Sequence, residues 1–135
     1  MLYRNVLQYN TKAKDKLDIT KDVQSVVEKY GVQDGICSIF LRGTTAAIML
    51  NEDDRMLMAD IEKLLSQLAP EEKLYQHPQN AHSHLRSMIL NNSMNIPISE
   101  GRLLLGKWQS IMLWEFDVEE RQRDIVVTII GSGQN

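Results

Sequence analysis

The fold is decided first by Lys107–Phe116, which reads KWQSIMLWEF. Its alternate positions fall into two sets, and such a period of two predicts a β-strand. One set holds Trp108, Met112, Trp114 and Phe116, and the other holds Gln109, Ile111, Leu113 and Glu115. Because both sets are largely apolar, we expect this strand to be covered on both faces.

A second strand of this kind lies near the end of the chain. Asp124–Ile130 reads DIVVTII, and its apolar residues again fall on both faces. We therefore expect it to be covered on both sides as well. In a chain of 135 residues, one small core does not supply enough apolar surface to cover both faces of two such strands. This favours the association of several copies of the chain.

Three further stretches read as strands. Tyr3–Tyr9 alternates and predicts a first strand. Gly35–Leu41 and Thr44–Leu50 are isoleucine-rich apolar runs, and the short break at Arg42-Gly43 favours a hairpin or another tight connection between them.

Three helices are expected between these strands. Thr20 can cap a short helix, and Gly31 suits the C-terminus of that helix. The polar segment Asn51–Asp54 begins a second helix, which Pro70 ends. The apolar stripe of this second helix consists of Leu57, Ile61, Leu64, Leu65 and Leu68. A third helix is predicted over about Asn80–Leu90. The residues that we expect to face inward on it are Leu85, Met88 and Ile89.

The order of these elements predicts an α+β fold with mostly antiparallel sheet layers and about three helices. The length of 135 residues suits one domain spanning 1–135.

The net charge of -3 and the pI near 5.6 argue against general nucleic-acid binding. No apolar stretch approaches the ~20 residues that span a bilayer. Met1–Asn5 lacks a signal-peptide core, so we expect a cytoplasmic protein.

The single cysteine, Cys37, stands in an apolar run and is interpreted as a small buried side chain. Three histidines lie close together in the sequence: His77, His82 and His84. Residues i and i+2 of a helix point about 200° apart, so His82 and His84 are not expected to face one site. The apolar pattern places His84 on the buried side and His82 toward solvent. Metal binding, proton transfer, phosphate binding and a structural role all remain open.

Several other polar residues are candidates for a site. Glu52 directly follows a strand, and strand ends often point side chains into a cleft. Gln109 and Glu115 share a face of an apolar strand, so they form either a hydrogen-bonded network or a site. Arg121 and Arg123 can bind an anion or stand in a solvated turn.

A set of short motifs follows one another in a specific order between Gly35 and Gly131. The motifs are Thr44-Thr45-Ala46-Ala47-Ile48 with Asn51-Glu52; Asp60 and Pro70; Tyr75-x-His77; Asn80-Ala81-x-x-His84-Leu85; Ser93 and Pro97; Gly101-Arg102-Leu103-x-Leu105-Gly106-x-Trp108-Gln109-x-Ile111; Glu115-x-Asp117; and Arg121-x-Arg123. Together they resemble the YjbQ family, and the Leu-Gly-x-Trp-Gln segment is the most specific part.

The resemblance implies a fold, an assembly and an activity. It implies an α+β homotrimer with sites near subunit boundaries. The activity that it implies is a secondary thiamine-phosphate synthase, which joins hydroxymethylpyrimidine diphosphate to thiazole phosphate and releases diphosphate. A small phosphorylated substrate or anion is the implied partner, and a divalent metal, zinc or magnesium, is the implied cofactor.

The same resemblance implies roles for single residues. The implied catalytic residues are Glu52, His77, His84 and Gln109. The implied substrate-binding residues are Thr44, Asn51, Arg121 and Arg123. The implied metal ligands are His77 and His84.

Two departures from the family pattern bear on function. Gly43 stands where the family usually has a histidine before the two threonines, so at most two of three expected imidazoles remain. Val118-Glu119-Glu120 replaces a shorter Gly-Pro turn after Asp117. Two alternatives to the synthase therefore stay open. One is a trimeric binding or assembly protein with weakened chemistry, and the other is a metal-dependent hydrolase of a small phosphorylated substrate.

Overall fold

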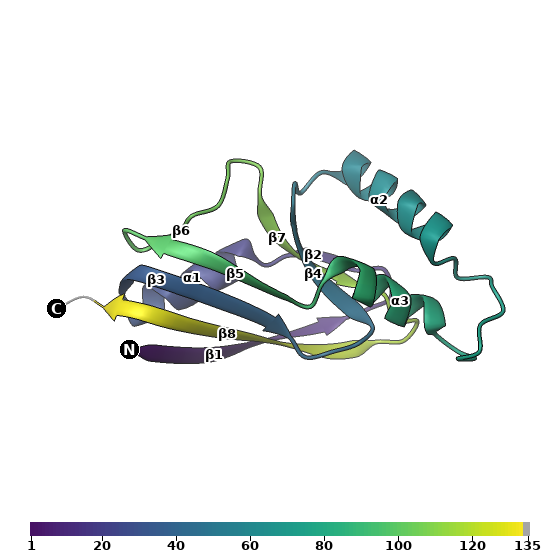
Figure 1. Ribbon diagram of the computed structural model, residues 1–135, viewed down its shortest axis with the longest axis horizontal. Helices are drawn as coiled ribbons and strands as arrows, with labels where there is room; N and C mark the ends of the chain where they lie inside the picture. Colours follow the sequence, from purple (N-terminus) through teal and green to yellow (C-terminus); the bar gives the residue numbers. More distant parts are fainter. Residues whose placement is uncertain (134–135) are drawn as a thin grey trace.

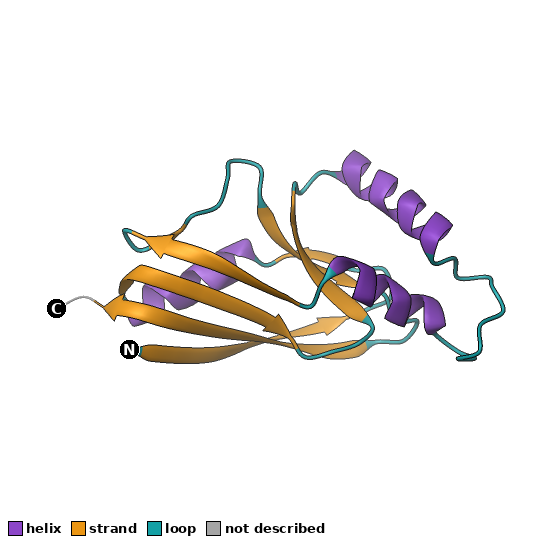
Figure 2. Cartoon of the chain, in the orientation of Figure 1, coloured by secondary structure: helices purple, strands orange, loops and turns teal. Residues whose placement is uncertain are grey.

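Two antiparallel sheets form the body of the molecule. A computed structural model describes residues 1–133 (Figures 1 and 2). The larger sheet has five strands in the order β1 (Leu2–Thr11), β8 (Arg121–Gly133), β3 (Val32–Leu41), β5 (Ser93–Ser99) and β6 (Arg102–Leu103). The smaller sheet has the order β2 (Lys16–Asp18), β7 (Ser110–Glu115) and β4 (Ala46–Asn51). With three helices beside these sheets, the expected α+β class is confirmed.

The strand β7 lies at the centre of the smaller sheet, and both of its faces are covered as expected. Ile111 and Leu113 pack into the main core between the two sheets and the first helix. Met112 and Trp114 pack into a second, smaller cluster on the opposite face. The strand begins at Ser110 rather than Lys107, because residues 106–109 close a turn.

The last strand differs from its prediction. In β8 the side chains of Ile125, Val127 and Ile129 are buried, whereas Ile130 on the other face is exposed. The prediction that this strand is covered on both faces is therefore wrong within one chain. The smaller sheet and the helix Thr20–Tyr30 cover one face of the larger sheet. Side chains on the other face, such as Phe40 and Ile130, are exposed.

The connection between β3 and β4 is tight, but it is not a hairpin. β3 pairs with β5 and β8, whereas β4 pairs with β7 in the other sheet. Residues 42–45 carry the chain across, and the Arg42 N–H donates to the Asp124 carbonyl at 3.1 Å. The sequence pattern could not separate these cases, because both need only two adjacent strands and a short turn.

The three helices lie where the sequence predicts them. α1 (Thr20–Tyr30) ends at Gly31, whose φ of 64° is the left-handed conformation that glycine favours. Thr20 does not cap this helix as predicted. Instead, the Asp18 carboxylate accepts from the Thr20 N–H and hydroxyl. The Thr20 hydroxyl accepts from the Ile111 N–H. No helix in residues 1–133 has the length and apolar character needed to cross a membrane.

The other two helices are α2 (Arg55–Leu68) and α3 (Ala81–Leu90). The Asp54 carboxylate caps α2 by accepting from the N–H groups of Met56 and Leu57. Of the apolar stripe of α2, only Leu65 is fully buried. In Figure 1, α2 lies at the outer edge of the molecule. Its residues Met58, Ile61 and Leu65 pack against Met112 and Trp114 of the smaller sheet.

The inward face of α3 differs from its prediction. Met88 and Ile89 are exposed, and the buried residues of the helix are Ala81, His82, Ser83, Arg86 and Ser87. Two hydroxyls hold this polar face against the strands: Ser87 Oγ donates to the Ala46 carbonyl at 2.6 Å, and Ser83 Oγ donates to the Phe116 carbonyl. These hydrogen bonds satisfy carbonyl groups at the start of β4 and beyond the end of β7, which an apolar face could not do.

Candidate functional site

A buried ion pair forms the base of the candidate site. The Arg123 guanidinium bonds the Glu115 carboxylate through two nitrogens, with 2.7 Å between Nε and Oε1. Its Nη2 also donates to Thr45 Oγ1 at 2.7 Å, and Thr11 Oγ1 donates to Glu115. Both charged side chains are buried, and a buried pair with several added hydrogen bonds holds a fixed geometry.

Asp117 extends this network toward the surface. It accepts from Thr45 Oγ1 at 2.9 Å and from Arg121 Nε at 2.8 Å. Burial by itself would raise the pKa of Asp117, but hydrogen bonds from Arg121, Thr45 and two backbone N–H groups outweigh burial and lower it. Asp117 therefore stays ionised and keeps Arg121 at the rim.

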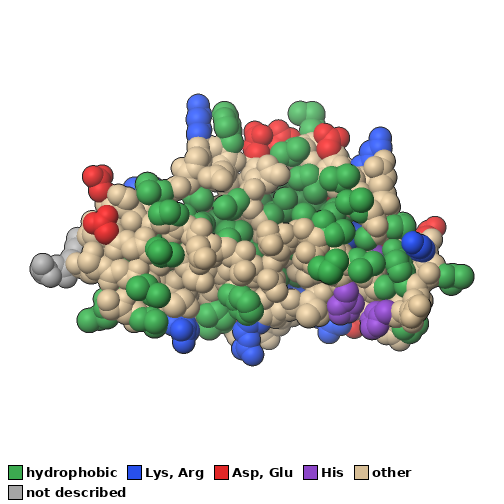
Figure 3. Space-filling view, in the orientation of Figure 1, with side chains coloured by type: hydrophobic (Ala, Val, Ile, Leu, Met, Phe, Trp, Pro, Cys, Tyr) green, Lys and Arg blue, Asp and Glu red, His purple; other side chains and the backbone are tan. Residues whose placement is uncertain are grey.

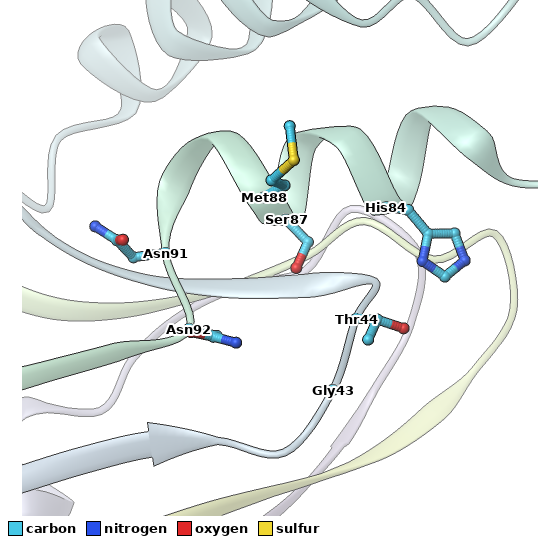
Figure 4. A pocket seen from close by; sticks show the side chains of 7 residues that line it. All are labelled: Gly43, Thr44, His84, Ser87, Met88, Asn91 and Asn92. Carbon is cyan, nitrogen blue, oxygen red and sulfur yellow. The ribbon is translucent and has the colours of Figure 1, made fainter.

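The network positions two arginines beside a polar hollow of about 310 Å³. The residues around it come from the β3–β4 connection, the start of α3 and the β7–β8 turn: Gly43, Thr44, Thr45, Asn80, His84, Asp117, Arg121 and Arg123. A second hollow of about 330 Å³ adjoins it along α3 and also includes Gly43, Thr44 and His84. Figure 4 shows this second hollow, with Thr44 pointing toward the His84 ring.

His84 lines both of these hollows, as do Gly43 and Thr44. It also lines a third, more apolar hollow of about 490 Å³ together with Tyr75, His77, Ala81 and Leu85. The rings of His77 and His84 meet edge to face with 5.0 Å between their centroids. His77 Nε2 lies 2.9 Å from Asn80 Oδ1, which fixes the ring of His77 at the edge of the site.

The structure reverses the predicted environments of the two helical histidines. His82 is buried, with 7% of its surface exposed, whereas His84 is half-buried and lines the hollows. The prediction failed because it assumed that the apolar side chains of α3 face the core, and α3 buries its polar side instead. His82 faces a separate cavity of about 120 Å³ that includes Glu71 and Arg86.

The described residues do not gather a full set of metal ligands. Residues 1–133 hold no cluster of three or more His, Cys, Asp or Glu side chains arranged around one ion position. His77 and His84 supply two imidazoles, and Gly43 supplies no side chain. Since structural and catalytic zinc sites use three or four protein ligands, this donor set does not fit such a site, and we derive no step through a metal.

Three predicted site residues lie elsewhere in the chain. Asn51 pairs with Ser110 at one end of the smaller sheet, whereas Ala46 pairs with Glu115 at the other. The six residues of β4 span about 17 Å at the usual rise per residue. Asn51, Glu52 and Gln109 are therefore not brought together with the histidines and arginines within one chain.

Gln109 has a local role. Its side-chain Oε1 accepts from the Gly106 N–H at 2.8 Å, and its own N–H donates to the Gly106 carbonyl at 3.1 Å. These two bonds close the turn that presents Trp108, which is 64% exposed. The Gly106–Gln109 segment thus builds a specific turn, distant from the polar hollow.

Asp117, Thr45 and Asn80 were not predicted to belong to the site. The sequence did contain a signal for Asp117, because Glu115 and Asp117 are two residues apart, as are Arg121 and Arg123. The acid and the base of each pair, Asp117 with Arg121 and Glu115 with Arg123, stand at equal distances on either side of the turn and meet across it, although β7 and β8 belong to different sheets. Thr45 and Asn80 carried no such signal, since their contacts come from distant parts of the chain.

The fold and site define an α+β protein whose arginine–carboxylate network supports a polar pocket beside a histidine-bearing helix. The family model described as UPF0047 protein YjbQ-like matches residues 5–132. The chain belongs to this YjbQ family. It is 40% identical over 118 residues to a UPF0047 protein of Methanothermobacter thermautotrophicus, covering 85% of this chain and 82% of the relative.

Solved structures agree with this assignment. A YbjQ-like protein of unknown function from Sulfolobus solfataricus is 36% identical with a TM-score of 0.93, covering 98% of this chain and 99% of that one. A YjbQ/UPF0047 family protein from Clostridium acetobutylicum is also 36% identical, with a TM-score of 0.83 and coverage of 92% and 99%. The three helices and antiparallel sheets are thus features shared with these relatives.

Proposed function

We propose that this chain acts on a small phosphorylated substrate as a thiamine-phosphate synthase-like transferase. The observation that supports this most is the pair Arg121 and Arg123, held by buried carboxylates beside His84 and Thr44. Guanidinium groups fixed in advance are suited to phosphate oxygens, because they donate hydrogen bonds without reorganising. The reaction itself is the one implied by the family resemblance.

In this reaction a carbon–oxygen bond to diphosphate breaks and a carbon–nitrogen bond to the thiazole forms. Negative charge grows on the departing diphosphate, and donors aimed at it lower the barrier. We assign Arg121, Arg123 and Thr44 to phosphate binding, and His77 and His84 to the reacting centre. Asn51, Glu52 and Gln109 lie outside this chain's own pocket, so their proposed roles require the pocket of a neighbouring copy.

We also propose that the protein assembles as a homotrimer. Two cross-strand rows on the open face of the larger sheet are apolar: Leu2, Ile130, Ile36 and Pro97 form one, and Val6, Val126 and Phe40 form the other. The chain exposes 8368 Å² of surface. A compact monomer of its mass exposes about 7,200 Å². The excess is on the order of the ~800 Å² that one partner contributes to a stable interface.

An assay of thiamine phosphate formation tests the transferase. The purified protein is supplied with hydroxymethylpyrimidine diphosphate and thiazole phosphate, and the product is measured by fluorescence after oxidation to a thiochrome. We expect product from the wild type and at least about a hundredfold less from His84→Ala, the usual scale for an acid–base group. Ile89→Ala, exposed on the same helix and outside the hollows around His84, serves as the control and should keep the activity.

An absence of product with the wild type, or equal product with His84→Ala, would refute the proposal.

A second candidate function, a trimeric binding protein with weakened chemistry, is favoured by Gly43. If wild-type protein binds thiazole phosphate without turnover, and Gly43→His gains turnover, the binding protein is the better description. A metal-dependent hydrolase has less support, because the described residues bring only two imidazoles together.

A further inference from the structure

A small cavity lies beside α3, apart from the hollows around His84. Its volume is about 120 Å³, and α3 lines it with His82 and Arg86. Asp117 also borders the polar hollow, but neither Arg123 nor His84 reaches this cavity. The proposed phosphate site therefore does not account for it.

Arg86 is buried beside this cavity with few short hydrogen bonds. Only 3% of the residue is exposed. Its Nε donates to the Ala69 carbonyl at 3.1 Å, but Nη1 lies 3.4 Å from Glu62 and Nη2 lies 3.5 Å from Ser66, and both of these distances exceed the usual ~3 Å. Glu62 is closer to Lys16, at 2.9 Å, so two cations share this one carboxylate. Because a buried charge is costly unless it is closely paired, a further anion beside Arg86 would stabilise it.

His82 offers a second unused group to the cavity. The residue is buried, and its Nε2 lies 3.4 Å from Ser83 Oγ, whose own proton goes to the Phe116 carbonyl. Its Nδ1 has no hydrogen-bond partner within residues 1–133. Since a buried polar atom without a partner costs free energy, a polar ligand in the cavity would also stabilise this ring.

The remaining charges around the cavity favour one negative charge inside it. Glu115 and Asp117 line the cavity, but each is paired with an arginine that does not. Burial lowers the pKa of His82, so its ring is neutral. What is left is three cations against two carboxylates: Lys14, Lys16, Arg86, Glu62 and Glu71. A monoanion would balance these charges.

The size and the apolar walls of the cavity limit the anion further. One water molecule takes up about 30 Å³ of liquid, so a cavity of about 120 Å³ holds about four non-hydrogen atoms. Ala13, Phe116 and Val118 add apolar surface to the polar groups. A phosphate ester exceeds this size, whereas a carboxylate with a short alkyl group matches both the volume and the mixed walls.

We infer that this cavity is a second binding site, whose ligand class is a small aliphatic carboxylate. The Arg86 guanidinium binds the carboxylate oxygens, His82 Nδ1 donates to one of them, and the alkyl group packs on the apolar wall. None of the residues assigned to the transferase reaction lines this cavity, so the inference does not depend on that reaction.

NMR spectroscopy of the protein tests the site, with the imidazole resonances of His82 as the reporter. His82→Asn assigns these resonances by their loss. The probes are acetate and acetamide, which have nearly the same shape but differ in charge, at about pH 7 and constant ionic strength. We expect acetate to shift the His82 resonances with saturation and to bind at least about tenfold tighter than acetamide, because only acetate gains charge-assisted hydrogen bonds.

Two variants examine the charge and the space separately. Arg86→Gln removes the guanidinium and should weaken acetate binding at least about tenfold. Ala13→Phe keeps Arg86 but fills the cavity from an exposed position, so acetate should no longer shift the His82 resonances. Lys12→Ala is the matched control, because Lys12 is an exposed cation of the same turn and does not line the cavity. This control should bind acetate as the wild type does.

Three results would each overturn the inference. They are a shift with acetate that never saturates, equal affinities for acetate and acetamide, and unchanged acetate binding in Ala13→Phe. The last of these does not require the Arg86→Gln protein to fold. Formation of thiamine phosphate, or its absence, leaves the result at this cavity unaffected.

Discussion

His82 and His84 stand two residues apart on one helix and have opposite environments. Burial lowers the pKa of His82 most, and the nearby Arg86 charge lowers it further, although Glu71 and Asp117 act in the other direction. His82 is therefore kept neutral inside the protein. His84 borders the hollows and is the imidazole available to a ligand.

The depressed pKa of His82 predicts a loss of stability in mild acid. As the pH falls through about 6.5, the imidazole of the unfolded chain takes up a proton before the folded one does. The unfolded state then binds more protons, so the free energy of unfolding decreases until the pH is below the folded pKa. We expect the melting temperature of the wild type to fall between about pH 7 and pH 5.5, and that of His82→Asn to fall less.

The measurement is thermal unfolding followed by circular dichroism across this pH range. His77→Asn removes an imidazole from an exposed position, and it shows what the loss of any histidine does by itself. If the curves for wild type and His82→Asn run parallel, His82 does not supply this pH dependence.

At the scale of elements, α2 and α3 present apolar side chains to solvent. Leu64 and Leu68 of α2 are exposed, as are Met88 and Ile89 of α3. Figure 3 shows hydrophobic side chains gathered in this region of the molecular surface. Since only Leu65 of α2 is fully buried, this helix depends on its own hydrogen bonds and its cap more than the buried strands do.

The cap of α2 can be tested on its own. Asp54→Ala removes the carboxylate that accepts from Met56 and Leu57, at 2.8 and 3.1 Å, and should destabilise the helix by about 1 kcal/mol. We expect faster amide hydrogen exchange throughout α2, with β3 and β8 unchanged. Asp60→Ala, an exposed position within the same helix, is the control. Equal acceleration in β3 would show instead that α2 opens only with the whole molecule.

At the scale of the whole molecule, the open face of the larger sheet is the feature that one chain does not explain. β8 lies between β1 and β3, so its outward residues join neighbours on both sides. Ile130 stands opposite Leu2 and Ile36, and Val126 stands opposite Val6 and Phe40. These two apolar rows have the polar row Arg4, Thr128, Ser38 and Asn95 between them. Exposed apolar side chains gathered in this way mark an interaction surface on soluble proteins.

Charge substitution on this face should dissociate the proposed trimer. In Ile36→Lys with Phe40→Lys, two ammonium groups would have to be desolvated at the interface, which strongly opposes association. We expect light scattering during size-exclusion chromatography to give a trimer mass for the wild type and a monomer mass for the double variant. Glu28→Lys, exposed on α1 across the sheet, should remain trimeric. A trimer mass for the double variant would place the interface elsewhere.

By itself the sequence determined the helices, most of the strands and the α+β class. These follow from local periodicity and capping residues, which act over a few neighbouring residues. It also predicted the burial of Cys37, whose thiol pKa is raised to about 12 by burial.

Only the tertiary structure decided which residues meet. It placed β3 and β4 in different sheets, turned the polar side of α3 inward and separated Glu52 and Gln109 from the histidines. It also brought Gly43 against Arg123, which lies eighty positions further along the chain by their residue numbers. The reason is that strand pairing and buried hydrogen bonds join distant segments, and the partner of a segment is not encoded in the local pattern of either one.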